Sequence, residues 1–212
     1  MVAKFPHVVS ILGPHGAGKT TLTQGLSDRS NGFLGFGVRS FFDSELSGPM
    51  RSLALPFIST GEHVPDELVV SGIERFLREN AGAKTVLLDG LPGTAEQHCR
   101  LRELFPGSSM MALHLAVSPE VCYERTSSRR TCVRCGAVTT IKESAHGLCS
   151  CGSTLSRRPD DEPSLALERI KLSSESVDSV LRCLGGNAVK LRGDRSRWVV
   201  LREARSLLER IL

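Results

Sequence analysis

The chain has 212 residues, 40% of them hydrophobic and 24% charged, which is typical of a globular protein with one substantial core and a small inserted module. The 27 basic and 23 acidic residues leave a mild net charge of +4, which suits a polyphosphate site better than it argues for nucleic-acid binding, and we expect no nucleic-acid partner. No apolar run approaches the roughly 20 residues of a membrane span, and the N-terminus shows no signal-peptide pattern. Four of the seven cysteines lie between positions 132 and 151, which favours a metal site in a reducing compartment over disulfides, so we expect a cytoplasmic protein.

Residues 13–20 read Gly-Pro-His-Gly-Ala-Gly-Lys-Thr and match a phosphate-binding pattern, in which a glycine and any four residues precede Gly-Lys and Ser or Thr. The apolar run at 7–12 predicts a buried strand before it, and a helix is expected to begin at Lys19. The glycines let backbone N–H groups converge on a phosphate, Lys19 can reach the outer phosphates, and a threonine hydroxyl can hold Mg²⁺. We therefore predict a nucleotide-binding loop that comprises Gly13, Pro14, His15, Gly16, Ala17, Gly18, Lys19, Thr20 and Thr21.

The pattern that follows the loop helix is less regular. Residues 30–37 are rich in glycine and predict a flexible connection, while 38–42 predict a short strand. In 44–58, Pro49 and Pro56 are expected to limit any helix to short pieces. A well-formed helix is then expected from residue 66, because acidic residues fill its first turn and an apolar face follows.

From residue 85 onward, apolar runs alternate with helical patterns. The expected elements are a strand at 85–88 buried on both faces, a strand at 110–117, a helix after Ser118, a helix at 163–184, a strand at 189–191 and a closing helix at 198–212. Residues 132–158 interrupt this alternation and are dense in Cys, Gly and Ser. The alternation predicts an α/β fold, a three-layer sandwich in which helices cover both sides of a parallel sheet.

Asp89 directly follows the apolar run at 85–88. It is therefore expected at the carboxyl edge of the sheet, beside the phosphate loop. A carboxylate at that place can orient water bound to Mg²⁺. The alternative is a loop carboxylate that caps the next turn.

The chain resembles the adenylate kinases from about Val8 to Val199, because five motifs occur in the order seen in that family. They are residues 13–21, Val-Pro-Asp-Glu-Leu-Val at 64–69, Leu-Leu-Asp-Gly-Leu-Pro at 87–92 with Gln97, Arg-Arg-Thr-Cys at 129–132, and Arg-Pro-Asp-Asp at 158–161 with Arg169. Such kinases move the terminal phosphoryl of ATP to a nucleoside monophosphate. The resemblance implies a single P-loop domain over 1–212, with an acceptor insert at 38–66 and a lid at 130–160. We expect a monomer that uses ATP and Mg²⁺.

The resemblance assigns catalytic roles to Lys19, Arg129, Arg158 and Arg169, which would hold the transferring phosphates. Guanidinium groups suit this task because they bind phosphate oxygens bidentately and stay charged. Arg125 resembles the family arginine that stacks on the donor base. It lies four residues before Arg129 near the end of a predicted helix, so both can project from one face. For any single arginine, a solvated surface charge is the alternative.

The resemblance also assigns residues outside this cationic set. Gly193 belongs to the predicted cofactor site, and Val64 and Gln97 belong to the predicted acceptor site, where Gln97 would read the base. Asp160 and Asp161 resemble carboxylates at the lid hinge, which could hold an open or closed lid by charge pairing.

Four cysteines fall where lids of this family can carry zinc, namely Cys132, Cys135, Cys149 and Cys151. Four thiolates fit a structural Zn²⁺ site, and a small lid has too little core to fold well alone. The second pair has one intervening residue where the family usually has two, and His146 is a possible substitute ligand. A redox-active or simply reduced cluster is the alternative. The other cysteines, Cys99, Cys122 and Cys183, are expected in the core.

The acceptor half departs from the family. Gly93 stands where the family has a phosphate-binding arginine, and a second such arginine is replaced by Phe42 or by Glu45, depending on the alignment. Arg39 is the nearest side chain that could compensate. We therefore predict an ATP-dependent nucleoside monophosphate kinase with a divergent acceptor site. The alternatives are a nucleotide-binding protein without kinase activity that acts in regulation, and a small-molecule kinase with a non-nucleotide acceptor.

Overall fold

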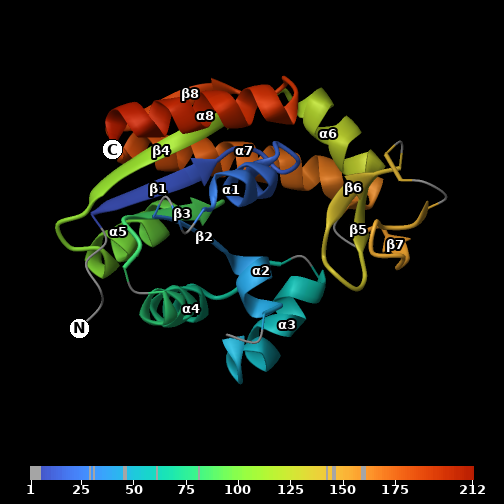
Figure 1. Cartoon of the computed structure of the whole chain (residues 1–212), viewed down its shortest axis with the longest axis horizontal. Coiled ribbons are helices and arrows are strands. Elements are labelled where there is room, and N and C mark those ends of the chain that lie inside the picture. Colours follow the sequence, from blue (N-terminus) through green and yellow to red (C-terminus); the bar gives the residue numbers. More distant parts are fainter. Residues whose placement is uncertain are drawn as a thin grey trace.

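The computed structural model of the chain describes residues 6–28, 30, 32–44, 47–60, 62–80, 82–141, 143–144, 147–158 and 161–212. At its centre lies a five-stranded sheet in the order β2-β3-β1-β4-β8, in which all neighbouring strands are parallel (Figure 1). Its strands are β1 (His7–Leu12), β2 (Phe33–Gly37), β3 (Thr85–Asp89), β4 (Ser109–Ala116) and β8 (Ala188–Arg192). The predicted parallel sheet is therefore confirmed.

Helices cover both faces of this sheet. On one face, α1 (Lys19–Leu26) and α8 (Arg197–Ile211) pack against Val9 and Ile11 of β1. On the other face lie α5 (Ala95–Leu104) and α7 (Pro163–Cys183), with Val8 and Leu12 of the same strand turned toward them. Apolar residues on both sides of β1 explain why its sequence is a continuous apolar run.

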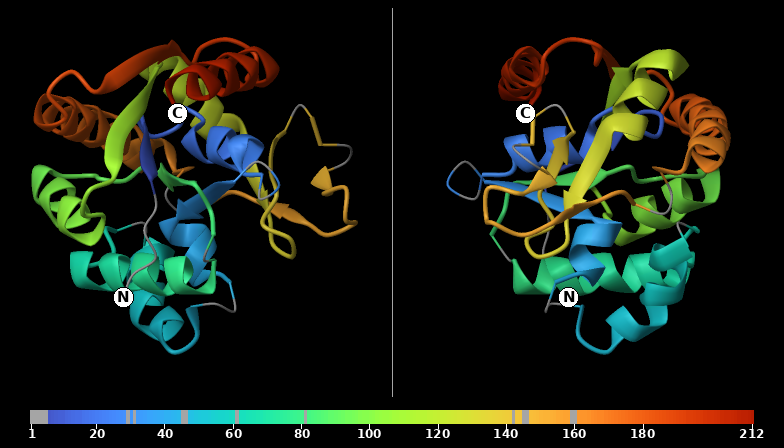
Figure 2. Two further views of the ribbon diagram at one scale, coloured as in Figure 1. Left: turned by 60° about the vertical axis from the view of Figure 1, so that its left-hand side comes forward. Right: turned by 90° about the vertical axis from the view of Figure 1, so that its right-hand side faces the viewer.

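Two smaller units flank the sheet. Helices α2 (Val38–Phe42), α3 (Met50–Thr60) and α4 (Asp66–Glu79) lie below it in Figure 1. After α6 (Pro119–Ser128), an antiparallel sheet forms in the order β6-β5-β7, and its strands are β5 (Arg129–Cys132), β6 (Val138–Thr140) and β7 (Leu155–Ser156). This small sheet projects from the main body in the left view of Figure 2. Among the described residues, no helix has the length and apolarity needed to cross a membrane.

Three predictions between residues 30 and 60 are wrong. Within the predicted flexible connection, residues 33–37 form β2, because their backbone pairs with β3 from Phe33 to Gly37. The predicted strand at 38–42 is helix α2, whose Phe41 and Phe42 pack in the aromatic part of the core. Helix α3 runs through Pro56, which is exposed, so water can satisfy the carbonyl that the missing N–H leaves unpaired.

The prediction for the isolated cysteines is correct only for Cys122, which is buried on α6. Cys99 and Cys183 are exposed. Cys99 lies next to buried His98 on α5, and one helical step turns it by about 100° toward solvent. Cys183 is the last residue of α7, past the buried Val180.

Candidate active site

The phosphate loop connects β1 to α1, and its glycines have conformations that other residues avoid. Gly16 has φ of 85°, and a Cβ there would lie 2.6 Å from the carbonyl oxygen of Cys122. Gly18 has φ of 99° and caps the N-terminus of α1. Both positions need glycine because left-handed backbone is unfavourable for residues with a Cβ. The loop therefore has the shape that lets successive N–H groups point inward.

Lys19 is held across this loop. Its Nζ donates hydrogen bonds of 2.8 Å to the carbonyl oxygens of Gly13 and Pro14. Burial lowers the pKa of Lys19, and the positive charges of Arg129 and Arg169 lower it further, while Asp89 opposes the shift. A partly buried ammonium with further cations nearby is a strong binding group for an anion such as a polyphosphate.

Asp89 lies at the carboxyl end of β3, opposite Ile11 of β1, at the sheet edge where the sequence places it. Its Oδ2 accepts a 2.6 Å hydrogen bond from the hydroxyl of Thr20. Burial raises the pKa of Asp89, although the Thr20 hydrogen bond and Lys19 oppose this. A hydroxyl and a carboxylate are oxygen donors of the kind that Mg²⁺ prefers, so these residues fit that ion. Thr21, the other candidate hydroxyl, is exposed one position further along α1.

Arg125 joins two parts of the predicted donor site. Its guanidinium donates to the carbonyl oxygens of Ala17 at 3.2 Å and Gly193 at 2.8 Å. The structure thereby brings together the phosphate loop, the last turn of α6 and the loop after β8. Its expected stacking on the donor base remains a prediction.

The sequence predicted that Arg125 and Arg129 lie on one helix, and this prediction is wrong. Helix α6 ends at Ser128, and Arg129 is the first residue of β5. The Nε of Arg129 donates to Asp161 Oδ2 at 2.8 Å, and its terminal nitrogen Nη2 contacts Asp161 Oδ1. Burial alone would raise the pKa of Asp161, but its contacts with the His15 ring and the Arg129 guanidinium outweigh burial and lower the pKa to about 2. Asp160, the other expected hinge carboxylate, lies outside the described residues.

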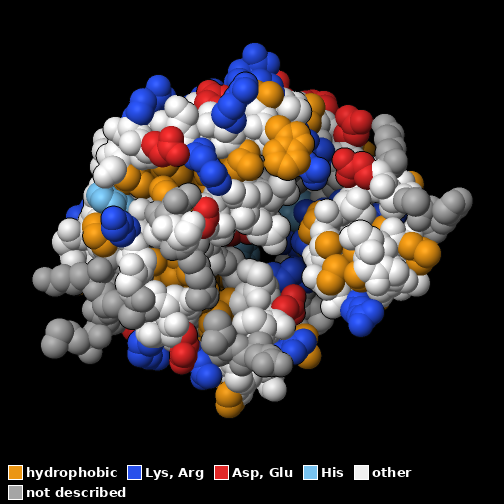
Figure 3. Space-filling view, in the orientation of Figure 1, with side chains coloured by type: hydrophobic (Ala, Val, Ile, Leu, Met, Phe, Trp, Pro, Cys, Tyr) orange, Lys and Arg blue, Asp and Glu red, His pale blue; other side chains and the backbone are white. Residues whose placement is uncertain are grey.

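The charges of the remaining two arginines act on groups in and beside the phosphate loop. Figure 3 shows a hollow near the centre of the molecule with Lys and Arg side chains along its right-hand rim. Arg158 donates from Nε to the Thr131 hydroxyl at 2.9 Å, and its charge opposes the rise that burial causes in the pKa of Asp89. Arg169 of α7 lies close enough to lower the pKa of Lys19 and of His15. All four predicted catalytic cations therefore gather around the phosphate loop.

The predicted acceptor residues each have contacts of their own. Gln97 accepts a 2.6 Å hydrogen bond from the N–H of Gly93 and donates one of 2.6 Å to Asp66. Val64 is buried, and Arg39 donates to the carbonyl oxygen of Ile58 at 3.2 Å. The side chain of Gln97 is thus oriented by partners on α4 and before α5.

The structure bears on the two positions offered for the second acceptor arginine. Phe42 is fully buried in the core, so this position cannot present a side chain to a ligand. Glu45 lies outside the described residues.

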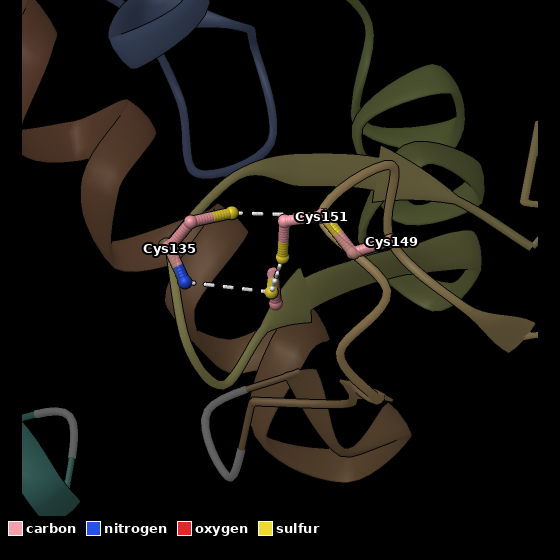
Figure 4. Close-up of side chains that lie close together, drawn as sticks. Cys135, Cys149 and Cys151 are labelled. Atoms are coloured by element: carbon pink, nitrogen blue, oxygen red, sulfur yellow. Dashed lines mark hydrogen bonds between the residues drawn. The ribbon is translucent and has the colours of Figure 1, made fainter.

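Four thiols converge in the small sheet and the turn beside it. The Sγ atoms of Cys132, Cys135, Cys149 and Cys151 all lie within 4.8 Å of one another. Figure 4 shows three of them turned toward a common centre. Backbone N–H groups donate to the Cys132 sulfur and lower the pKa of that thiol to about 6, which favours a thiolate. The set fits tetrahedral Zn²⁺, while His146 lies outside the described residues.

Some contacts of the site involve residues that the sequence analysis missed. The Ser173 hydroxyl of α7 accepts a 2.7 Å hydrogen bond from the N–H of His15, and the Ser176 hydroxyl donates to the carbonyl oxygen of Gly93. Asp66 orients Gln97. The signal for the serines was their place, three residues apart, on a helix whose pattern is otherwise apolar on one side.

Comparisons with known proteins support the family resemblance seen in the sequence. A family model described as an AAA domain matches residues 9–136. An adenylate kinase from Clostridium tetani is 30% identical over 198 residues, which cover 89% of this chain and 91% of that protein. Adenylate kinases from Oceanobacillus iheyensis (30% identity, 94% of this chain and 98% of the relative) and Kosmotoga olearia (34%, 82% and 84%) are similar to it as well. The chain therefore belongs to the adenylate kinase family.

Proposed function

We propose that this protein is a nucleoside monophosphate kinase that transfers the terminal phosphoryl of ATP to AMP or a related monophosphate. The observation that carries the proposal is the gathering of Lys19, Arg129, Arg158 and Arg169 around one phosphate loop. The names of the similar relatives support the same activity. Phosphoryl transfer needs positioning and charge neutralisation more than a covalent catalyst, and this set supplies both.

Different residues would bind the phosphates, hold Mg²⁺ and exclude water. The loop N–H groups and Lys19 would bind the donor phosphates, and the arginines would contact the transferring group from the opposite side. Thr20 and Asp89 would hold Mg²⁺, which neutralises charge on the phosphates when it is bound. Residues 130–160 would then act as a lid that excludes water, stabilised by Zn²⁺ on the four cysteines.

The acceptor half supports the view that capture of the monophosphate differs from the family pattern. Residues 38–66 would form the acceptor insert. Phe42 is buried and Gly93 has no side chain, so neither position offers a side chain to a phosphate. This observation also favours a second candidate function, a nucleotide-binding protein that has lost transfer and acts through closure of its lid.

Gly93→Arg is expected to improve AMP use. Gly93 is not among the glycines with positive φ, and a Cβ there meets only the flexible end of Gln97 at 3.3 Å, so the backbone accepts a side chain. Each charge-assisted hydrogen bond contributes about 1.5–3 kcal/mol, so the KM for AMP should fall by about tenfold or more. Initial rates at saturating ATP, with AMP varied, measure this directly.

The matched control is Gly93→Met, which adds comparable length without a charge. Arg39→Ala, made in the original chain, should raise the KM for AMP and leave the KM for ATP unchanged, if Arg39 compensates for the missing arginines. An original chain that already saturates with AMP as readily as an ordinary adenylate kinase would contradict the weakened acceptor site. Equal KM values for AMP in Gly93→Arg and Gly93→Met would also contradict it, because the added charge would then have no effect.

A further inference from the structure

The segment proposed as the lid begins and ends at a single ion pair. Arg129 immediately precedes residues 130–160, and Asp161 immediately follows them. The two side chains bind each other through both nitrogen–oxygen contacts described above, and 18% of the Arg129 side chain and none of the Asp161 side chain is exposed. This largely buried pair, which we call the lid neck, joins the two ends of the segment.

His15 connects the lid neck to the phosphate loop. Its Nε2 lies 3.2 Å from a guanidinium nitrogen of Arg129 and 3.4 Å from Asp161 Oδ1. The main chain of His15 is fixed independently, because its N–H donates to the Ser173 hydroxyl of α7. Only 14% of the side chain is exposed. His15 is thus held by α7 through its backbone and meets both residues of the lid neck through its ring.

One imidazole nitrogen cannot serve both partners in the same way. Without a proton, Nε2 accepts a hydrogen bond from Arg129, whereas with a proton it donates to Asp161. Burial lowers the pKa of His15 below its usual value of 6.5, and the charges of Arg129 on β5, Arg169 on α7 and Lys19 on α1 act in the same direction. The hydrogen bond to Asp161 opposes them. A pKa below 6.5 leaves the ring neutral at neutral pH. In the neutral tautomer that carries its hydrogen on Nδ1, Nε2 accepts from Arg129, which is also the nearer partner.

We propose that His15 is a positioning residue, whose Nε2 holds the Arg129 guanidinium beside the phosphate loop and thereby links that loop to the lid neck. This role rests on the proposed function, because Arg129 is one of the groups that would bind the transferring phosphoryl. His15 itself touches the two residues of the neck and acts on the reaction through them.

The test compares His15→Ala with His15→Gln in the full chain. Glutamine can place an acceptor oxygen near the position of Nε2 but does not titrate, so it should keep most of the kcat at pH 7.5. Alanine removes the acceptor and should lower kcat by about tenfold or more, with a smaller change in the KM for ATP. Comparison of the two variants separates loss of the hydrogen bond from loss of the fold.

The pH profile gives a readout that a purely structural role would not move. In the original chain, kcat should fall in acid as His15 gains a proton and releases Arg129, and this acid limb should be absent from His15→Gln. The control is His114→Gln on β4, which removes another histidine whose pKa burial lowers and should leave the limb in place. An acid limb that persists in His15→Gln, or a normal kcat in His15→Ala, would overturn the proposal.

A measurement without turnover keeps this inference distinct from the proposed function. NMR titration of the His15 ring in the full chain should give a pKa below 6.5, and Arg129→Met should raise it because a neighbouring positive charge is lost. An unchanged His15 pKa in Arg129→Met would contradict the contact, whether or not the protein transfers phosphoryl groups. Absence of transfer to every monophosphate, with the pKa shift present, would instead refute the proposed function and, with it, the positioning role in transfer.

Discussion

Lys19→Ala is expected to reduce phosphoryl transfer by at least about 10²-fold, because removal of one preorganised charge at a water-excluded site costs that much or more. The side chain is partly buried and already spans the loop through the carbonyls of Gly13 and Pro14, so its ammonium lies where the donor phosphates would bind. Steady-state rates with saturating ATP and acceptor measure the effect.

The control for this substitution is Lys171→Ala, which removes an exposed lysine of α7 and should leave the rate unchanged. Calorimetric titration with ATP should also show weaker binding to Lys19→Ala. Near-normal turnover by Lys19→Ala would mean that the phosphate loop is not the catalytic centre.

Loss of metal from the cysteine cluster is expected to have the second large effect. Purification without chelator should give close to one Zn²⁺ per chain, and Cys132→Ser should lower this content to a small fraction. Cys132 is buried, and the described part of the cysteine-bearing segment contributes few other residues to the core, so metal binding and folding should be coupled. Elemental analysis measures the metal, and limited proteolysis reports the loss of structure between residues 132 and 156.

Cys99→Ser provides the matched control, since it removes an exposed thiol on α5 and should keep the full metal content. If the purified protein contains no zinc and chelator does not change its rate of proteolysis, the proposed Zn²⁺ site is contradicted. The cluster would then be a set of reduced or redox-active thiols, the alternative that the sequence left open.

The sequence was sufficient to predict the sheet wherever its strands are buried on both faces. β1 and β3 are continuous apolar runs that end at the phosphate loop and at Asp89. β2 escaped prediction because its signal is tertiary. A Cβ at Gly35 would collide with the Ser27 hydroxyl, so glycine there permits close approach of the strand to the chain after α1 rather than flexibility.

Prediction of the candidate site was limited in a similar way. The loop pattern placed Lys19 and Thr20, and the strand end placed Asp89, because each follows from local spacing. The contact of His15 with the lid neck did not follow, since its partners lie 114 and 146 residues away in the chain. A contact of that range depends on how β5 and α7 pack beside the loop, which neither spacing nor composition encodes.

A coupled assay of ADP formation from ATP, run against a panel of nucleoside monophosphates, tests the central claim most directly. The gathered cations and the oriented Gln97 predict transfer to at least one monophosphate, with AMP requiring a raised concentration. Transfer should depend on Mg²⁺ and should be lost in Lys19→Ala. Binding of ATP without transfer to any member of the panel would contradict the proposed kinase activity and favour a nucleotide-binding role.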